Sequence, residues 1–264
     1  MRRSLWIVCL VLFCFASVLS GRSLRKDFRK RLDFVSGGQV IVDNTSGTIS
    51  ALSWSDNAVE ILADIEVKAG SQREAEAFLE KVEIRVDASS DRIMVEADYP
   101  KRRDDGNILD WIFGRRKPRV KIDYLIRVPR RTDLDLKSVN GPISVLDITG
   151  QVVLHSTNGR IESEGVCGSV RAKTVNGGIS IDLEELDSVN QTSAKTTNGS
   201  IRISLPGDVK VDLEASTVNG SVSTDLPLTI QGNWHKKRIS GQMNGGGARM
   251  TLRTVNGSIR IHER

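Results

Sequence analysis

The sequence predicts an all-β protein whose strands stack as a parallel β-solenoid, and three observations favour this fold class. An Asn-Gly pair with Ser or Thr two positions before the asparagine recurs six times in the C-terminal half of the chain, and the first three of these asparagines are 18 residues apart. The residues that flank each pair alternate between apolar and polar types, which is typical of strands. The same residue types return at the same positions in every copy, which is the sign of a structural repeat. The six pairs, predicted to form corners, are Asn140-Gly141, Asn158-Gly159, Asn176-Gly177, Asn198-Gly199, Asn219-Gly220 and Asn256-Gly257.

The positions around each asparagine form columns when the copies are aligned. A hydroxyl residue stands two positions before each asparagine, and a β-branched residue stands three positions after it. These columns read Ser138, Ser156, Thr174, Thr196, Thr217, Thr254 and Ile143, Ile161, Ile179, Ile201, Val222, Ile259. Asn and Gly both tolerate a positive φ, so a sharp turn of the chain is expected at each pair.

An antiparallel β-meander or sandwich is the alternative fold. Asn-Gly between two alternating strands is a strong hairpin signal, and a run of hairpins gives an antiparallel sheet. Alternation fits both folds. Uniform columns favour the solenoid, because a solenoid stacks equivalent residues directly on one another.

Residues 1–21 are predicted to be a secretory signal peptide. Arg2 and Arg3 precede an apolar run over residues 5–19, and the small residues Ser20 and Gly21 follow it. The run is shorter than the roughly 20 residues that a membrane span needs. An uncleaved N-terminal membrane anchor is the alternative. Without this segment Cys167 is the only cysteine, so no internal disulfide is expected, and Cys167 is interpreted as a small apolar filler.

The rest of the chain is predicted to form one elongated domain. Residues 22–36 are a basic lead-in, and residues 37–264 form the solenoid, with a loop insertion at 100–118. Before the first full repeat, strands are expected at 40–51, 59–67, 84–88, 93–97 and 120–128. Ser71, followed three residues later by Glu74, predicts the start of a short helix. This helix would cover an end or flank of the solenoid, because open edge strands need cover.

The loop insertion holds an apolar, aromatic cluster between basic residues. Trp111, Ile112 and Phe113 are candidates for contact with a membrane surface or a partner protein. The competing interpretation is that their side chains fold back and plug a coil of the solenoid.

An outward position in the repeats is mostly basic. The residues three positions before the asparagines are Lys137, His155, Lys173, Lys195, Ser216 and Arg253. In a solenoid they would form a column of charges at strand spacing, which could bind an anionic polymer such as an envelope polysaccharide, or lipid head groups. The competing interpretation is a solvated charged face that protects the sheet from aggregation.

The sequence predicts no enzyme, and no catalytic residue, cofactor site or metal site. The acidic residues Glu162, Glu164, Asp182, Glu184, Glu185 and Asp187 are interpreted as scattered, and the three histidines are far apart in the sequence. Nucleic acid is not an expected partner, because the formal net charge of +5 falls when Arg2 and Arg3 are removed and aromatic residues are scarce in the repeats.

The TVNGSI-type repeats, together with the segments at 40–49 and 126–129, resemble a bacterial putative-adhesin family of unknown function with β-strand repeats. The resemblance covers residues 34–264. It implies a right-handed β-helix-like domain on an exported protein in the periplasm, at the cell surface or outside the cell. The predicted function is therefore a non-catalytic structural or adhesive binding module of the cell envelope. The alternatives are a carbohydrate-active enzyme on the same scaffold and an envelope signalling accessory that docks a membrane partner.

Overall fold

The computed structural model describes residues 23–99, 118–187, 189–230 and 237–264. The predicted signal peptide at 1–21 lies outside these residues, and so do the candidate contact residues Trp111, Ile112 and Phe113.

The described residues form an all-β protein with twenty strands and one helix. The elements are β1 (Ser23–Asp33), β2 (Gln39–Ser46), β3 (Ile49–Trp54), β4 (Ala58–Lys68), α1 (Gln72–Leu79), β5 (Glu83–Ala88), β6 (Arg92–Asp98), β7 (Arg119–Pro129), β8 (Asp133–Asn140), β9 (Ile143–Leu146), β10 (Thr149–Asn158), β11 (Ile161–Lys173), β12 (Ile179–Glu185), β13 (Gln191–Asn198), β14 (Ile201–Leu205), β15 (Val211–Asn219), β16 (Val222–Thr224), β17 (Thr229–Ile230), β18 (Arg238–Met243), β19 (Ala248–Asn256) and β20 (Ile259–Glu263).

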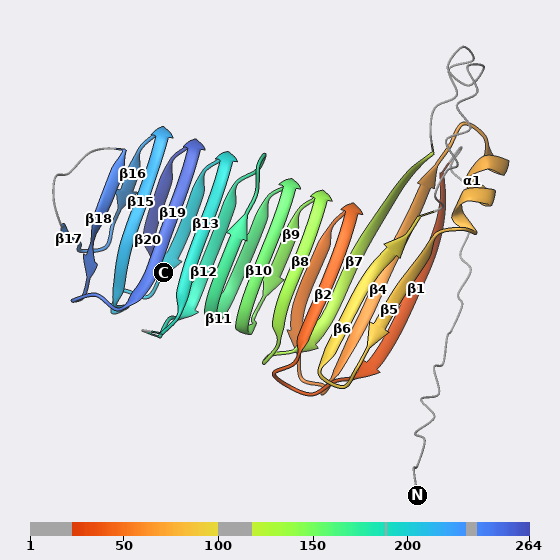
Figure 1. The fold of residues 1–264 in the computed structure, drawn as a ribbon, viewed down its shortest axis with the longest axis horizontal. Coiled ribbons are helices and arrows are strands. Elements are labelled where there is room, and N and C mark those ends of the chain that lie inside the picture. The colour runs from red at the N-terminus through yellow and green to blue at the C-terminus, as the bar shows by residue number, and fades with distance from the viewer. Residues whose placement is uncertain (1–22, 100–117, 188, 231–236) are drawn as a thin grey trace, which may run out of the picture.

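The strands form two rows that share one core (Figure 1). Neighbours in the first row follow the order β5–β6–β2–β8–β10–β11–β13–β19–β15–β18–β17. Neighbours in the second row follow the order β1–β4–β7–β3–β9–β11–β12–β14–β20–β16. Strand β11 belongs to both rows. It passes from one to the other at Gly165 and Gly168, whose φ angles of 65° and 133° favour glycine.

Within the repeats the strands pair in parallel, with equivalent residues in register. Asn158 pairs with Asn140 in the first row, and Ile161 pairs with Ile143 in the second. The stack of repeats is therefore solenoid-like, as predicted. Both ends are antiparallel instead: β1 with β4, β4 with β7 and β5 with β6 at one end, and β15 with β18 at the other. Apart from β15, the strands in these antiparallel pairs lack the Asn-Gly repeat.

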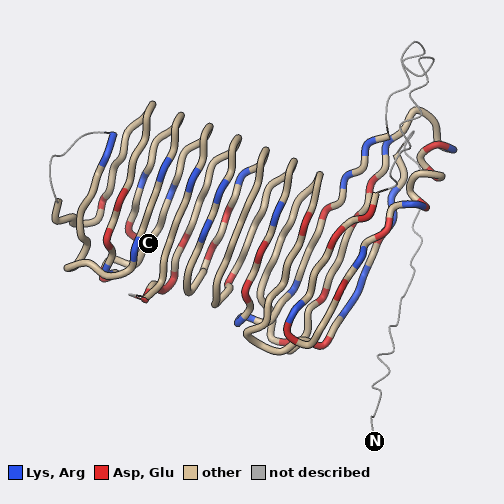
Figure 2. The backbone as a smooth tube through the Cα atoms, in the orientation of Figure 1, with Lys and Arg blue, Asp and Glu red and all other residues tan. Residues whose placement is uncertain are grey.

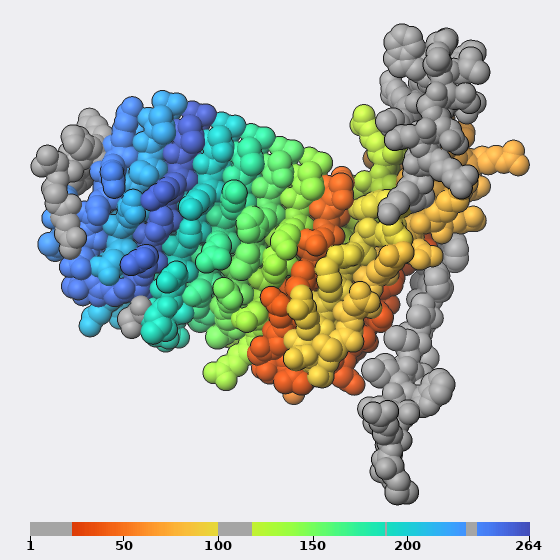
Figure 3. Space-filling view, in the orientation of Figure 1, coloured from red at the N-terminus to blue at the C-terminus, as the bar shows by residue number. Residues whose placement is uncertain are grey.

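The coils, each made of one strand from either row, do not stack in chain order. The last coil, β19–β20, lies between the coil β13–β14 and the coil β15–β16. In Figures 1 and 3 this appears as a dark blue strand among lighter blue and cyan ones. The chain therefore completes its stack by insertion, which the spacing of the repeats did not predict.

The core consists of inward columns from both rows. In the first row, the column four residues before the asparagines is buried throughout. In the second row, the β-branched column is equally buried. These columns are Leu136, Leu154, Ala172, Ala194, Leu252, Ala215 and Ile143, Ile161, Ile179, Ile201, Ile259, Val222. Both columns belong to one continuous hydrophobic core, which runs along the whole stack.

The glycine that follows each asparagine is required by close packing. A Cβ on Gly159 would lie 1.9 Å from the carbonyl oxygen of Gly141, and one on Gly177 would lie 2.1 Å from that of Gly159. The predicted reason, a positive φ at Asn and Gly, was wrong for all six asparagines and for five of the six glycines, because only Gly257 among these residues has a positive φ, of 157°. Among the described non-glycine residues only Asp147 and Asn244 have a positive φ. The corner backbones of neighbouring coils simply leave no room for a side chain.

The repeated asparagines form a hydrogen-bonded ladder along the stack. The Nδ2 of Asn158 donates to the Oδ1 of Asn140 at 2.9 Å, and the next four steps of the ladder measure 2.8 Å each. Beside the ladder, the buried hydroxyl of Thr174 donates to the carbonyl oxygen of Gly159 at 3.0 Å, and the equivalent residues Ser156, Thr196, Thr254 and Thr217 do the same. Asparagine and threonine are thus selected for their side-chain donors.

The N-terminal end differs from the prediction at its first element. The segment expected as a basic lead-in contains β1, an 11-residue strand that pairs with β4 along its whole length. Its leucines and Phe28 pack against the core, while its arginines face outward. Leu24, Phe28 and Leu32 stand four residues apart on one face of the strand, and the charged residues between them obscured this signal.

The predicted helix is present and contacts β1 and β4, so it covers the N-terminal end of the stack. Its N-cap is Ser71, whose hydroxyl accepts a hydrogen bond from the backbone N–H of Glu74 at 3.2 Å. Ala75 is fully buried, and Phe78 and Leu79 pack against the core.

Candidate functional site

The five predicted basic residues stand side by side on five consecutive strands of the first row. His155 pairs with Lys137 on one side and with Lys173 on the other. Lys195 pairs with Lys173 and with Arg253. We call this set, Lys137, His155, Lys173, Lys195 and Arg253, the basic column. Figure 2 shows basic residues on neighbouring strands of the stack.

Insertion of the last coil keeps the basic column continuous. In chain order Ser216 would separate Lys195 from Arg253, but Arg253 lies between Lys195 and Ser216 in the structure. At the other end the column continues into acidic residues, because Lys137 pairs with Asp43 and Asp43 pairs with Glu96. The column therefore changes sign between β2 and β8.

The charges of the basic column are only partly neutralised. The Nζ of Lys137 lies 3.0 Å from the Oδ2 of Asp135, and Arg253 lies 3.1 Å from Glu214. In the described part of the chain, Lys173 and Lys195 form no ion pair. The middle of the column thus presents ammonium groups that are available to an external anion.

His155 is the titratable member of the basic column. Its burial lowers the pKa of the imidazole. Asp135 acts against this shift, while Lys173, Lys137 and Arg171 act with it. The imidazole is therefore mostly neutral at pH 7, and the column gains a charge only in more acidic conditions.

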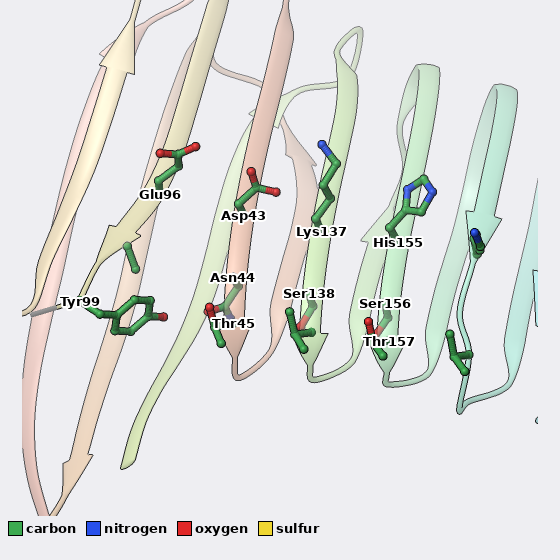
Figure 4. A pocket seen from close by; sticks show the side chains of 14 residues that line it. Asp43, Asn44, Thr45, Glu96, Tyr99, Lys137, Ser138, His155, Ser156 and Thr157 are labelled. Carbon is green, nitrogen blue, oxygen red and sulfur yellow. The ribbon is translucent and has the colours of Figure 1, made fainter. Parts of the chain in front are cut away.

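A groove of about 660 Å³ lies across the N-terminal end of the basic column. Figure 4 shows its side chains, which come from β2, β6, β8, β10, β11 and the segments that follow them. Its lining includes acidic Asp43 and Glu96, basic Lys137, His155 and Lys173, and the aromatic Tyr99. Tyr99 lies beside Asn44 and Thr45 in this view.

A column of β-branched residues, which sequence reasoning missed, borders the same groove. These residues immediately precede the repeat asparagines, with Thr45 at the equivalent position of β2. In spatial order they are Thr45, Val139, Thr157, Val175, Thr197, Val255 and Val218. Val139 is 45% exposed and Val218 is 56% exposed, which is unusual for valine in a strand. The alignment of the repeats carried this signal, since every copy has Thr or Val at the position.

A second groove, of about 570 Å³, lies on the outside of the second row. Serines and three carboxylates line it: Glu162, Glu164 and Asp182. These residues were interpreted as scattered, and that interpretation was wrong, because parallel stacking brings them onto one surface. Two of the three are paired with arginine, Glu162 with Arg160 at 3.0 Å and Asp182 with Arg264 at 3.4 Å.

Cys167 is half-buried in β11, and its surroundings are polar. Its thiol donates to the Oε2 of Glu184 at 3.6 Å, and the same carboxylate oxygen accepts from Arg130 at 2.9 Å. The interpretation of Cys167 as an apolar filler was therefore wrong.

Histidine and acidic side chains of the described residues do not assemble into a metal-binding group of three or more. His262 lies 2.8 Å from Asp225, in the second row and apart from His155. Within the described ranges, no helix combines the length and hydropathy needed to cross a membrane.

Comparison with known proteins identifies relatives of this chain. A family model described as Toastrack DUF4097 matches residues 32–262. The structure is similar to a putative cell adhesion protein from Clostridium sporogenes, with 12% identity, a TM-score of 0.52 and coverage of 91% of this chain and 100% of that one. A putative adhesin from Bacteroides fragilis matches with 11% identity, a TM-score of 0.42 and coverage of 89% and 97%. The first likeness supports the fold. No curated protein matches the chain.

Proposed function

The chain belongs to the Toastrack DUF4097 family, and from this premise we propose that it is a non-catalytic binding module of the cell envelope. Its ligand is an extended anionic polymer, such as an acidic polysaccharide, which lies across the strands along the basic column. The observation that carries the proposal is the in-register pairing of Lys137, His155, Lys173, Lys195 and Arg253 on neighbouring strands.

The spacing of the column suits a polymer with regularly repeated charges. Neighbouring strands lie about 4.8 Å apart, so the column offers a basic group at each step of that length. Each anion of such a polymer that contacts the column increases the overall affinity. Once the first contact has formed, the other anions are held close to the remaining basic groups by the polymer chain. The flat, rigid stack also holds the cations in place before binding, which reduces the entropy lost on association.

Binding of polygalacturonic acid, a linear polymer with one carboxylate per sugar, tests this proposal. We expect the triple variant Lys137→Ser/Lys173→Ser/Lys195→Ser to bind at least about tenfold more weakly than the wild type, because three charge-assisted contacts with anions are lost. The matched control is Arg202→Ser/Lys210→Ser/Arg260→Ser, which removes the same charge from exposed positions outside the column.

The control should bind the polymer within about twofold of the wild type at equal ionic strength, because those charges lie away from the ligand. Equal losses in the two triple variants would mean that only net charge matters, and the proposal would fail. Uncharged dextran serves as the negative polymer and should not bind.

The second groove provides the only specific observation in favour of the alternative, a carbohydrate-active enzyme. A pair of carboxylates is the usual requirement for glycoside hydrolysis. Here Glu162 and Asp182 each form an ion pair with an arginine. An adjacent guanidinium favours the ionised carboxylate, which suits a structural ion pair better than a general acid. Release of reducing sugar from the polymers above, abolished by Glu164→Gln, would support the enzyme over the binding module.

We also infer export and a right-handed coil. Residues 1–21 would act as the signal peptide, the domain would begin with β1, and residues 100–118 would form its loop insertion, with Trp111, Ile112 and Phe113 available to an envelope partner. N-terminal sequencing of the protein from fractionated cells tests cleavage.

The right-handed winding is inferred from the strong preference of connections between parallel strands for the right-handed direction. A crystal structure tests it.

A further inference from the structure

The groove at the N-terminal end of the basic column has opposite charges on neighbouring strands. Asp43 and Glu96 occupy the same column as Lys137 and His155, one and two strands further along the row. Figure 4 shows Glu96, Asp43, Lys137 and His155 in this order across four strands. An anionic polymer alone does not account for this arrangement, because two carboxylates at the end of the column would repel it.

Among the described residues, the carboxylates and the basic groups of the groove do not form ion pairs with each other. The ammonium of Lys137 contacts Asp135, two residues away on its own strand, at a distance of 3.0 Å. Across the described residues, neither Asp43 nor Glu96 forms an ion pair with a Lys or Arg. Lys173, at the other side of the groove, also has no carboxylate partner there. The groove therefore has an acidic half and a basic half, each able to bind an external charge.

Two features of the acidic half suit an organic ammonium group. The aromatic Tyr99 lines the groove on the same side as Asp43 and Glu96. Aromatic rings attract organic cations by cation–π interaction. Thr45 and Val139, from the exposed column of Thr and Val that precedes the asparagines, add methyl groups to the same surface. An alkylated or primary ammonium can thus meet carboxylates, a ring and methyl groups together.

We propose that this groove binds a zwitterionic phosphoamino alcohol of the phosphoethanolamine or phosphocholine class. The amine lies at Asp43 and Tyr99 and the phosphate lies at Lys137 and His155, with Glu96 and Lys173 as the flanking charges on the outer sides. Two methylene groups separate the charges of such a ligand, a span comparable to the roughly 4.8 Å between neighbouring strands. The inference deepens the proposed function and rests on the basic column being a ligand-binding surface.

Isothermal titration of the full-length protein with glycerophosphocholine and glycerophosphoethanolamine tests the inference. Glycerol phosphate and choline serve as the single-charge probes. We expect each zwitterion to bind at least about tenfold more tightly than either single-charge probe, because both halves of the groove are used. Asp43→Asn/Glu96→Gln should remove this preference while leaving the weak binding of glycerol phosphate in place.

Two control variants separate this inference from the polymer proposal. Lys195→Ser lies in the basic column but outside the groove, so it should weaken polygalacturonic acid and leave the zwitterions unchanged. Asp208→Asn/Glu263→Gln removes the same charge as the acidic double variant at exposed positions outside the groove and should have no effect. If glycerol phosphate binds as tightly as the zwitterions, or if Asp43→Asn/Glu96→Gln changes nothing, the inference is overturned while the polymer proposal stands. If the wild type binds the zwitterions but does not bind polygalacturonic acid, the polymer proposal is overturned.

Vesicles distinguish the possible sources of the ligand. Sedimentation with phosphatidylethanolamine vesicles, lost in Asp43→Asn/Glu96→Gln, would assign the head group of a membrane lipid. Binding of the soluble zwitterions without vesicle binding would assign a soluble or polymer-linked group, and both results support the inference. If the protein binds neither the soluble zwitterions nor the vesicles, the inference is overturned.

Discussion

In the parallel stack formed by the repeat coils, neighbouring coils share uncharged contacts that recur from coil to coil. In the antiparallel N-terminal end, formed by β1, β4 and β7, neighbouring strands contact each other through ion pairs that occur once. The stack has the asparagine ladder, the threonine-to-glycine hydrogen bonds and glycines packed against carbonyl oxygens. The end has Glu60, only 1% exposed, between Arg29 at 2.5 Å and Arg127 at 3.0 Å.

The difference shows how each region specifies its strand neighbours. A repeat can use one contact at every step only if that contact joins a residue to a copy of itself. An amide does this, because it donates and accepts, whereas a charge repels its copy. The end is not bound by this rule, so it can use opposite charges, with the guanidinium of Arg31 also 5.1 Å from the ring of Trp54. We expect the stack to be sensitive to side-chain size and the end to be sensitive to charge.

The largest effect should come from adding a single methyl group to a corner. In Gly177→Ala the new Cβ would lie 2.1 Å from the carbonyl oxygen of Gly159, held by the ladder on both sides. We expect the free energy of unfolding to fall by about 3 kcal/mol or more, because overpacking here requires the backbone to move. Urea denaturation followed by circular dichroism measures this loss.

The next residue supplies the control. In Gly178→Ala the Cβ would lie 3.3 Å from the carbonyl oxygen of Ser200, so a shift of a few tenths of an ångström is sufficient. The loss should stay below about 1 kcal/mol. Comparable losses in the two variants would contradict the close-packing explanation of the corners.

An intermediate effect should follow from removing the cations around Glu60. Arg29→Met/Arg127→Met leaves a buried carboxylate without a partner, which we expect to cost about 3 kcal/mol of unfolding free energy. Adding Glu60→Gln to the double variant should recover most of this loss, because a neutral amide is cheaper to bury. If the triple variant is no more stable than the double, packing by the arginine stems, and not charge, holds this end.

The smallest effect should come from placing a charge in the ladder. Asn176→Asp loses the donor to the Oδ1 of Asn158, now at 2.8 Å, and brings a carboxylate towards that oxygen. We expect a loss of about 1–2 kcal/mol at pH 7, since the ladder is exposed to solvent. Near pH 3 the carboxyl is protonated and can donate in place of the amide, so the variant should be at least as stable as Asn176→Ala, which has no donor, whereas at pH 7 it should be the less stable of the two. An equal gap between these two variants at both pH values would contradict the charge explanation.

The sequence alone determined the strands of the stack, because the repeated columns and the period-two alternation arise from each coil's own residues. It also predicted the helix from Ser71 and Glu74, and it aligned the members of the basic column. The membership of Thr45 and the valines in an exposed column was equally readable, but apolar residues in strands are ordinarily assigned to the core.

Only the tertiary structure decided which coils are neighbours. Equivalent columns in β13, β15 and β19 are nearly interchangeable, so local residues do not state that β19 lies next to β13. For the same reason the sequence did not reveal that Asp43 and Glu96 extend the basic column, or that Glu162, Glu164 and Asp182 share a groove. Repetition makes each coil predictable and its position ambiguous, because a contact between like residues fits any copy equally well.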